Sequence, residues 1–171
     1  MKKIGVISDT HGDLDDRIFH HLQEVDEIWH AGDVGSLAVL DKLRSFKPTR
    51  CVYGNIDDHE IRKETVLFDR FQVDGVEVLM THIAGKPGKY SKPLWDELSK
   101  NGNPNILVCG HSHILLVKMD KLKNMLWINP GACGYKGFHS VRTIVRFVIN
   151  EGNIQNMEAI ELGKRGQTSM Q

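Results

Sequence analysis

The sequence predicts an α/β protein in which two mixed β-sheets pack together and helices lie on the outside. In the first half, short β-type runs alternate with amphipathic helical stretches, and this order predicts parallel strands joined by right-handed crossovers. In the second half, a hairpin signal and several strand-like runs add antiparallel pairing. The chain has 171 residues, of which 40% are hydrophobic, so it can form one sizeable core but not several domains.

Strands and helices alternate from the amino terminus onward. Residues 4–7 form a compact strand, and apolar side chains then recur at helical spacing over residues 14–25. Extended-type sequence returns at residues 27–30. Ser36 is the expected N-cap of the next helix, and residues 50–53 form the third strand. A polar connection follows this strand.

A hairpin opens the second half of the chain. Residues 68–73 and 76–81 flank Asp74-Gly75, a preferred two-residue turn between antiparallel strands. The glycine- and lysine-rich segment 83–93 is expected to be a flexible basic loop, whose lysines either steer a phosphate substrate or are simply solvated. A short helix over residues 91–101 follows.

The remaining strands have the alternation of half-buried sheet. Two are expected at residues 106–109 and 114–117. The runs 125–128, 141–149 and 156–162 predict a β-meander, because in the middle run Val141, Thr143, Val145, Phe147 and Ile149 alternate on one face.

Composition and charge exclude several classes of protein. Lys+Arg and Asp+Glu both number 22, so no basic surplus supports stable nucleic-acid binding by phosphate neutralisation. Three cysteines without a CxxC spacing are typical of reduced thiols in the cytoplasm. No apolar run approaches the ~20 residues of a membrane span, so no membrane association is expected. We expect one domain over residues 1–162 and a flexible tail over 163–171.

Metal-ligand residue types follow five of the predicted strands. In open α/β sheets, ligand-binding groups collect at the carboxyl ends of strands. Each segment alone has an ordinary explanation, because aspartates cap helices, Gly-Asp and Gly-Asn form turns, and a single histidine is more often a core residue. Five in succession are hard to explain as independent turns. The segments are Asp9-Thr10-His11, Gly32-Asp33, Gly54-Asn55, Thr81-His82 and Gly110-His111-Ser112-His113.

The number of candidate ligands predicts a dinuclear centre. One ion with an open coordination position uses fewer protein groups than these segments supply. Asp33 is the natural bridge because a carboxylate has two oxygens, whereas the amide of Asn55 offers one. Two divalent ions leave a positive surplus that suits a phosphoryl group attacked by a metal-bound hydroxide. The candidate ligands are Asp9, His11, Asp33, Asn55, His82, His111 and His113.

In their order, the five segments resemble the motif blocks of the calcineurin-like metallophosphoesterases. Residues 1 to about 150 resemble the small single-domain phosphodiesterase branch found in bacteria and archaea. The resemblance implies a four-layer αββα sandwich. It implies that one ion is held by Asp9, His11, Asp33 and His113, and that the other is held by Asp33, Asn55, His82 and His111.

Ile56 departs from the larger phosphatases that this sequence resembles. There, a histidine follows Gly-Asn as general acid, and an acidic residue orients it; here the two positions are Ile56 and Asp57. Isoleucine cannot donate a proton, and positioned proton transfer contributes typically ~10²–10⁴-fold. Substrates with good leaving groups should therefore be favoured. His59 is either a substitute acid or an exposed loop histidine.

These residues predict a dinuclear metal-dependent phosphodiesterase of the cytoplasm. Asn55, His82 and His111 are the expected catalytic residues because they hold the second ion near the substrate. Two divalent ions per chain are expected, with Mn²⁺ as first choice and Fe²⁺, Ni²⁺ or Zn²⁺ as alternatives, since imidazole-rich sites suit transition metals. The expected substrate is a small phosphoester or a nucleotide, and the sequence leaves open whether the chain forms a homo-oligomer.

Two other functions stay open as alternatives. A phosphomonoesterase or protein phosphatase is disfavoured by Ile56. A non-catalytic protein-interaction scaffold is the alternative from another class, because a metal-poor relative in the superfamily is a subunit of a sorting coat; a scaffold has no need of these ligands. Two further residues are of interest: His30 either supports a ligand or packs in the core, and Cys109 is interpreted as a buried structural thiol.

Overall fold

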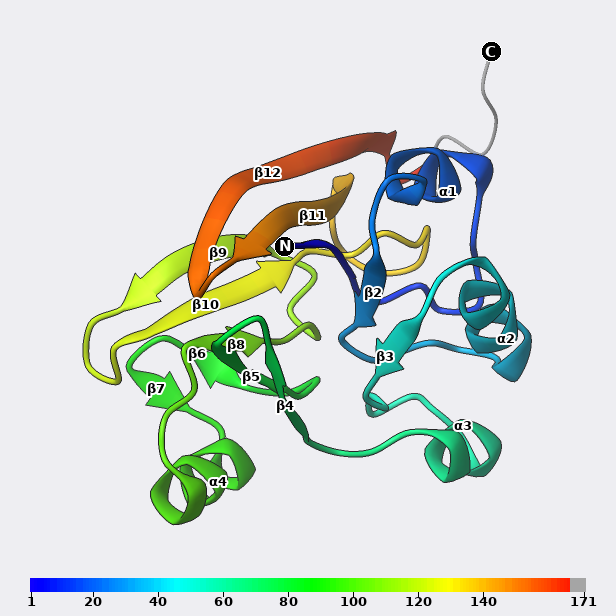
Figure 1. Ribbon diagram of the computed structural model, residues 1–171. Helices are drawn as coiled ribbons and strands as arrows, with labels where there is room; N and C mark the ends of the chain where they lie inside the picture. The colour runs from blue at the N-terminus through cyan, green and yellow to red at the C-terminus, as the bar shows by residue number, and fades with distance from the viewer. Residues whose placement is uncertain (167–171) are drawn as a thin grey trace.

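The computed structural model describes residues 1–166 and contains two five-stranded mixed sheets that pack face to face (Figure 1). The first sheet has the order β12-β11-β1-β2-β3 and consists of β1 (Lys2–Ile7), β2 (Glu27–His30), β3 (Thr49–Cys51), β11 (Val141–Asn150) and β12 (Asn153–Lys164). The second has the order β4-β5-β8-β10-β9 and consists of β4 (Asp69–Val73), β5 (Val76–Met80), β8 (Ile106–Val108), β9 (Leu115–Asp120) and β10 (Met125–Pro130).

Helices cover the outer face of each sheet. Figure 1 shows α1, α2 and α3 gathered on one side of the molecule and α4 on the other. Their bounds are α1 (Asp16–Leu22), α2 (Leu37–Phe46), α3 (His59–Glu64) and α4 (Lys92–Asn101). The layers therefore run helix, sheet, sheet, helix, which confirms the predicted αββα sandwich. No helix within residues 1–166 is long and apolar enough to cross a membrane.

Three apolar clusters hold these layers together. The central cluster lies between the sheets, where Trp29 packs edge to face against Phe147 with ring centroids 5.6 Å apart. A second cluster packs α1, α2 and α3 onto the first sheet through buried side chains such as Leu22, Leu40 and Ile61. The third packs α4 onto the second sheet. Each sheet is thus buried on both faces.

Parallel pairing in the first sheet determines where the site forms. As predicted, β2 is parallel to both β1 and β3. Ile7 lies opposite His30, and His30 lies opposite Cys51, so the three strands end at nearly the same level. The loops after these strands therefore emerge side by side. The predicted hairpin is also present, with Asp74 and Gly75 both at positive φ.

The predicted β-meander is wrong. β10 pairs with β8 and β9 in the second sheet, whereas β11 pairs with β1 and β12 in the first, so the chain changes sheets between β10 and β11. The alternation along residues 141–149 identifies one buried face, which contains Val145, Phe147 and Ile149, although Ile144 on the other face is buried as well. It cannot indicate which sheet a strand joins, because both sheets bury the same kind of side chain.

Two elements occur where a connection or loop was predicted. Helix α3 has only one buried residue, Ile61, so its apolar periodicity is too short to detect; Asp58 caps it by accepting a hydrogen bond from the amide of Ile61 at 3.1 Å. In the basic segment, β6 (Gly85–Lys86) and β7 (Lys89–Tyr90) form a small antiparallel hairpin. Of the predicted tail, residues 163 and 164 belong to β12, and residues 167–171 lie outside the described residues.

Candidate metal centre

Two candidate ligand loops of the first sheet run side by side. Asp9 and Asp33 follow the parallel neighbours β1 and β2. The amide of Asp9 donates to the carbonyl of Gly32 at 3.0 Å, and the amide of His11 donates to the carbonyl of Asp33 at 3.0 Å. Backbone hydrogen bonds therefore bring the candidate ligands of both loops to one point.

The second sheet brings its own loops to the same point. His82 and His111 follow the parallel neighbours β5 and β8, and the amide of Gly110 donates to the carbonyl of His82 at 3.1 Å. The amide of His111 donates to Oδ2 of Asp9 at 3.2 Å, which joins the loops of the two sheets. The candidate ligands thus lie where both sheets end.

The backbone of these loops is unusual, because several non-glycine residues have positive φ. Their φ angles lie between 48° and 69°, in the left-handed region. Such residues cost about 1–3 kcal/mol each and persist where surrounding structure holds them, commonly at functional sites. The residues are Asp9, His11, Asp33, His111 and His113, all candidate ligands. This conformation turns successive side chains toward the same space.

The side chains form two groups of possible ligands, each with its ligand atoms within 4.8 Å of one another. The first group is Asp9, His11 and His113. In it, Oδ1 of Asp9 lies 3.1 Å from Nε2 of His113 and 3.7 Å from Nε2 of His11.

The second group is Asp33, His82 and His111, and Asn55 adjoins it. Oδ1 of Asp33 lies 3.2 Å from Nε2 of His82. Oδ1 of Asn55 lies 3.0 Å from Nδ1 of His111, and both of these side chains are exposed at the rim of the site. All seven sequence-predicted ligands are therefore in one cluster.

Asp33 connects the two groups. Its Oδ1 faces His82, and its Oδ2 lies 3.5 Å from Nε2 of His11 in the first group. Nε2 of His82 also lies 3.9 Å from Oδ1 of Asp9. One carboxylate thus presents an oxygen to each group, which is the arrangement that a bridging ligand requires.

The donor chemistry of the cluster fits cations. Among residues 1–166, the buried atoms without a hydrogen-bond partner include Oδ1 of Asp9, Nε2 of His11 and Nε2 of His82. Nδ1 of His82 donates to the carbonyl of Ala31 at 2.7 Å, so the neutral ring presents a lone pair at Nε2. A lone pair facing a carboxylate oxygen is repulsive unless a cation or proton lies between them. Buried acceptors arranged in this way match a metal site.

Electrostatics keep the carboxylates ionised. Burial raises the pKa of the Asp9 carboxyl, but the neighbouring imidazoles of His11 and His113 outweigh it, so the net pKa lies well below the usual range. For Asp33, burial raises the pKa, and the contact with His82 reverses this to a net lowering. Burial lowers the pKa of His82, and Asp33 reverses this to a net increase. The raised pKa means that His82 binds a proton more readily, and a cation would displace that proton.

Asp57 is a buried structural residue, which the sequence did not indicate. Its carboxylate accepts from the amides of Val34 at 3.1 Å, Gly35 at 2.9 Å and Gly54 at 2.7 Å. It therefore joins the loop of Asp33 to the loop that precedes Asn55. The carboxylate of Asp57 is buried, whereas the neighbouring side chain of Ile56 is 46% exposed. His59, the first residue of α3, is exposed.

His30 supports the ligand loops through backbone and hydroxyl groups. Its Nδ1 accepts from the amide of Gly32 at 3.1 Å, and its Nε2 lies 2.9 Å from the hydroxyl of Thr10. That hydroxyl donates to the carbonyl of Val34 at 2.8 Å. Burial lowers the pKa of His30 to about 4, so its ring is neutral at pH 7. Cys109 is buried, which raises its pKa and makes it inert, in agreement with the structural interpretation.

His139 is a site residue that sequence reasoning missed. Its Nε2 donates to the carbonyl of Gly134 at 2.9 Å, so its neutral Nδ1 is an acceptor. That atom lies 3.0 Å from Nδ1 of His113, which must therefore be the donor. The proton on Nδ1 leaves Nε2 of His113 as a lone pair facing Asp9. No motif spacing signals His139, because the loop from β10 to β11 brings it into place.

Two hollows border the cluster. One, of about 170 Å³, is lined on one side by Asn55 and His82. The other, of about 570 Å³, lies beside Ser112 and is lined by the β6–β7 hairpin, including Lys86 and Lys89. Both include Ser91. A substrate bound at the cluster thus has room on two sides.

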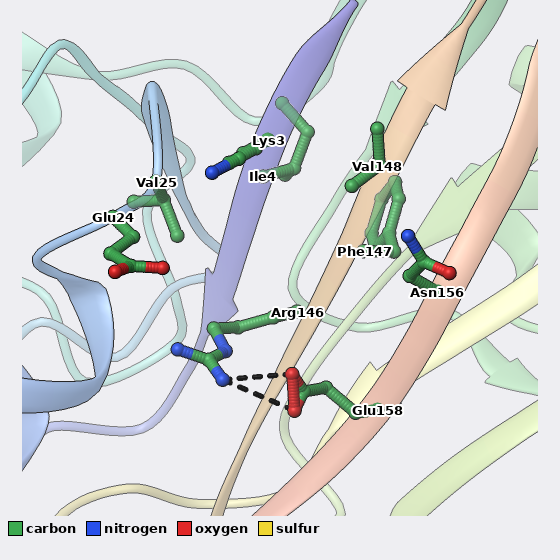
Figure 2. Close-up of a pocket in the computed structure, with 9 residues that line it drawn as sticks. All are labelled: Lys3, Ile4, Glu24, Val25, Arg146, Phe147, Val148, Asn156 and Glu158. Carbon is green, nitrogen blue, oxygen red and sulfur yellow. Dashed lines mark hydrogen bonds and ion pairs between the residues drawn. The ribbon is translucent and has the colours of Figure 1, made fainter.

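A further hollow lies away from the cluster. Figure 2 shows this space, of about 150 Å³, over strands β1, β11 and β12. None of the candidate ligands lines it. Its one guanidinium, that of Arg146, is neutralised by the carboxylate of Glu158 at 2.8 and 3.1 Å, as the dashed lines in Figure 2 mark. We assign no function to it.

The fold and the donor set together define a metal-binding αββα sandwich protein. The family model described as the calcineurin-like phosphoesterase superfamily domain matches residues 1–152. The chain therefore belongs to the calcineurin-like phosphoesterase superfamily, and the resemblance drawn from the motif segments is confirmed.

Individual relatives agree with this assignment. A probable metallophosphoesterase of Methanothermobacter thermautotrophicus is 31% identical over 134 residues, which cover 75% of this chain and 76% of the relative. The structure of an archaeal phosphodiesterase matches with a TM-score of 0.72 and 23% identity, over 94% of this chain and 99% of that one. Vps29 of Chaetomium thermophilum matches with a TM-score of 0.73 and 15% identity, over 95% and 97%. At these identities the two structures show similarity of fold alone.

Proposed function

We propose that the protein is a phosphodiesterase that uses two divalent metal ions. The observation that carries the proposal is the position of Asp33, whose two oxygens face the two ligand groups at 3.2 and 3.5 Å. When bound, two divalent ions activate a water as nucleophile and polarise the phosphoryl oxygens. Mn²⁺ is the proposed metal because both groups combine carboxylate with imidazole.

The chain's own residues then have distinct tasks. Asp9 and Asp33 supply the negative charge of the site, and Asp33 connects the two groups. Hydrogen bonds to Ala31 and His139 orient the rings of His82 and His113. The exposed side chains of Asn55 and His111 form the edge that the substrate reaches first. We therefore propose Asn55, His82 and His111 as the residues nearest the phosphoryl group.

The residue after Asn55 favours diesters with stable leaving groups. Ile56 is exposed and apolar, and it cannot protonate a departing oxygen. An alkoxide leaving group needs that proton more than a phenolate does. Phosphomonoesters of simple alcohols are thus the poorer substrates.

A protein-interaction scaffold is the alternative, and it is favoured by the similarity of fold to Vps29. Against it stand the buried acceptor atoms of Asp9, His11 and His82, which have no donor within residues 1–166. Such atoms are costly to bury, typically by about 1–3 kcal/mol each, and a scaffold gains nothing from them. The three cysteines are free and buried, in keeping with the proposed cytoplasmic location.

The test combines metal binding with one substitution. Metal-free protein titrated with Mn²⁺ should bind about two ions per chain and then hydrolyse bis(p-nitrophenyl) phosphate. Asp33→Asn should abolish turnover while the circular dichroism spectrum stays unchanged, because the amide cannot supply a second anionic oxygen. Asp13→Asn, in the neighbouring loop between β1 and α1, is the control. Binding of a single ion with full activity, or near-normal turnover of Asp33→Asn, would refute the proposal.

A further inference from the structure

The hollow beside Asn55 and His82 has the size and chemistry of a specificity pocket. Its volume is about 170 Å³, close to that of apolar protein cavities of ~150 Å³ that bind benzene. It therefore holds one six-membered ring. Because two candidate ligands form part of its wall, a group in the pocket lies next to the phosphoryl position.

The pocket wall is apolar. Leu67 and Ile83 line it and are 44% and 41% exposed, so they present apolar surface that a bound group can cover. Pro93 and the ring of Tyr53 complete the apolar surface. Covering these side chains with a ring removes apolar area from water and stabilises the complex.

Two polar side chains of the wall, those of Ser91 and Arg62, already make hydrogen bonds. Ser91 donates its hydroxyl to the carbonyl of Ile83 at 2.9 Å. Arg62 lies over the ring of Tyr53 at 4.7 Å and donates from Nε to the carbonyl of Asp57 at 2.7 Å. Its Nη2 lies 3.4 Å from the carbonyl of Gly54. These contacts hold the wall rigid and leave it suited to an uncharged guest rather than to a second phosphate.

We propose that this pocket binds an uncharged, single-ring aryl or heterocyclic ester group of the substrate, and thereby selects aryl phosphodiesters over small alkyl ones. The proposal rests on the proposed function, because the phosphoryl group must sit at the two ligand groups. It also agrees with Ile56, since an aryl oxygen departs without a proton donor.

Phosphonates test the pocket without turnover. Calorimetric titration of the Mn²⁺-loaded protein should show phenylphosphonate binding about 10- to 100-fold more tightly than methylphosphonate, because burying one ring contributes on this scale. Leu67→Asp, which charges the wall, and Leu67→Trp, which fills the space, should each remove this preference. Affinity for methylphosphonate should change less than affinity for phenylphosphonate in both, and least in Leu67→Trp, which adds no charge.

Leu122→Asp is the matched control, because Leu122 is 70% exposed and does not line the pocket. It should keep the wild-type preference. Equal affinity of the wild type for the two phosphonates, or a preference that survives both Leu67 variants, overturns the pocket proposal alone. Failure of both phosphonates to bind overturns the phosphoryl-binding function and the pocket together.

Discussion

The ring of His113 is oriented by a second imidazole, that of His139. The chain of donors runs from His113 through His139 to the carbonyl of Gly134, so the ligand lone pair of His113 depends on a residue outside the cluster. Groups that orient metal-bound histidines typically change metal affinity by ~10–100-fold when they are mutated. This defines the first prediction.

His139→Leu should weaken the binding of one of the two proposed Mn²⁺ ions by ~10–100-fold in calorimetry. In His139→Asn, the asparagine is close in shape to leucine, but its Oδ1 can accept the hydrogen bond from His113. This variant should therefore retain most of the Mn²⁺ affinity. Long-range ¹H–¹⁵N NMR of the metal-free protein should show His113 protonated at Nδ1 in the wild type and in the Asn variant, but not in the Leu variant. Protonation of wild-type His113 at Nε2 would contradict this account.

His30 makes stability sensitive to acid. Burial lowers its pKa to about 4 from 6.5, so below pH 6.5 the unfolded chain binds a proton that the folded protein excludes. Stability is therefore lost as the pH falls from 6.5 toward 4. The linkage amounts to about 2 kcal/mol between pH 7.5 and pH 5.

The comparison with His30→Gln isolates this effect. Urea unfolding should be measured in the presence of chelator at pH 7.5 and pH 5. Between these pH values, the free energy of unfolding should fall by about 2 kcal/mol more in the wild type than in the variant. The difference cancels the contributions of the ligand histidines, which are common to both proteins. Parallel pH dependences would mean that His30 titrates normally in the fold.

At the level of residues, the site residues that could be predicted are those close to the end of a strand. Asp9, Asp33 and His82 each follow a strand within three residues, so the order of strands and loops was enough to infer that they lie together. His139 and Asp57 act through contacts made by loops, and the residue types around them are ordinary. Their roles become visible only when tertiary structure places Gly134 or Val34 within hydrogen-bonding distance.

Two loops of the first sheet behave as one element because Asp57 ties them together. Three backbone amides donate to its carboxylate, from the segments that carry Asp33 and Asn55. Asp57→Asn replaces one accepting oxygen by an NH₂ group that faces amide donors. The free energy of unfolding should fall by about 3 kcal/mol, and Mn²⁺ affinity should fall with it.

Asp58→Asn is the adjacent control. Asp58 caps α3, and asparagine caps helices as well as aspartate does, so this variant should unfold within about 0.5 kcal/mol of the wild type. Denaturant unfolding and calorimetry give both quantities. Equal stability of the two variants would show that the three amide contacts of Asp57 contribute little to stability.

Elements were predictable where their pattern is long or their turn is specific. The helix predicted over residues 91–101 and the Asp74-Gly75 hairpin meet these conditions, and the structure contains both. Helix α3 buries one side chain and leaves no periodic signal. The placement of β10 and β11 in different sheets depends on long-range pairing, which alternation along one strand cannot specify.

At the scale of the molecule, the ligand groups connect the two sheets. Asp9 and His11 follow β1 of the first sheet, whereas His113 precedes β9 of the second. Ions bound to both groups therefore oppose separation of the sheets. Because the ligands come together only in the folded protein, metal binding adds directly to its stability.

Mn²⁺ at ~1,000 times its dissociation constant should raise the melting temperature of metal-free protein by about 10 °C or more, since one such site contributes ~4 kcal/mol. Differential scanning calorimetry with and without chelator measures the shift. Asp33→Asn should show a smaller increase. An unchanged melting temperature would mean that the ligand groups hold no ion in the folded protein.

The left-handed backbone at the site restricts its evolutionary future. Glycine, asparagine, aspartate and histidine tolerate positive φ far better than bulky or branched residues do. A lineage descended from this chain that no longer needed metal would exchange Asp9 or Asp33 for asparagine or glycine long before valine or leucine. Such substitutions would remove the carboxylate charges before they changed the backbone conformation of the loops. The descendants would therefore keep the loop structure of a metal site after they had lost the ability to bind metal.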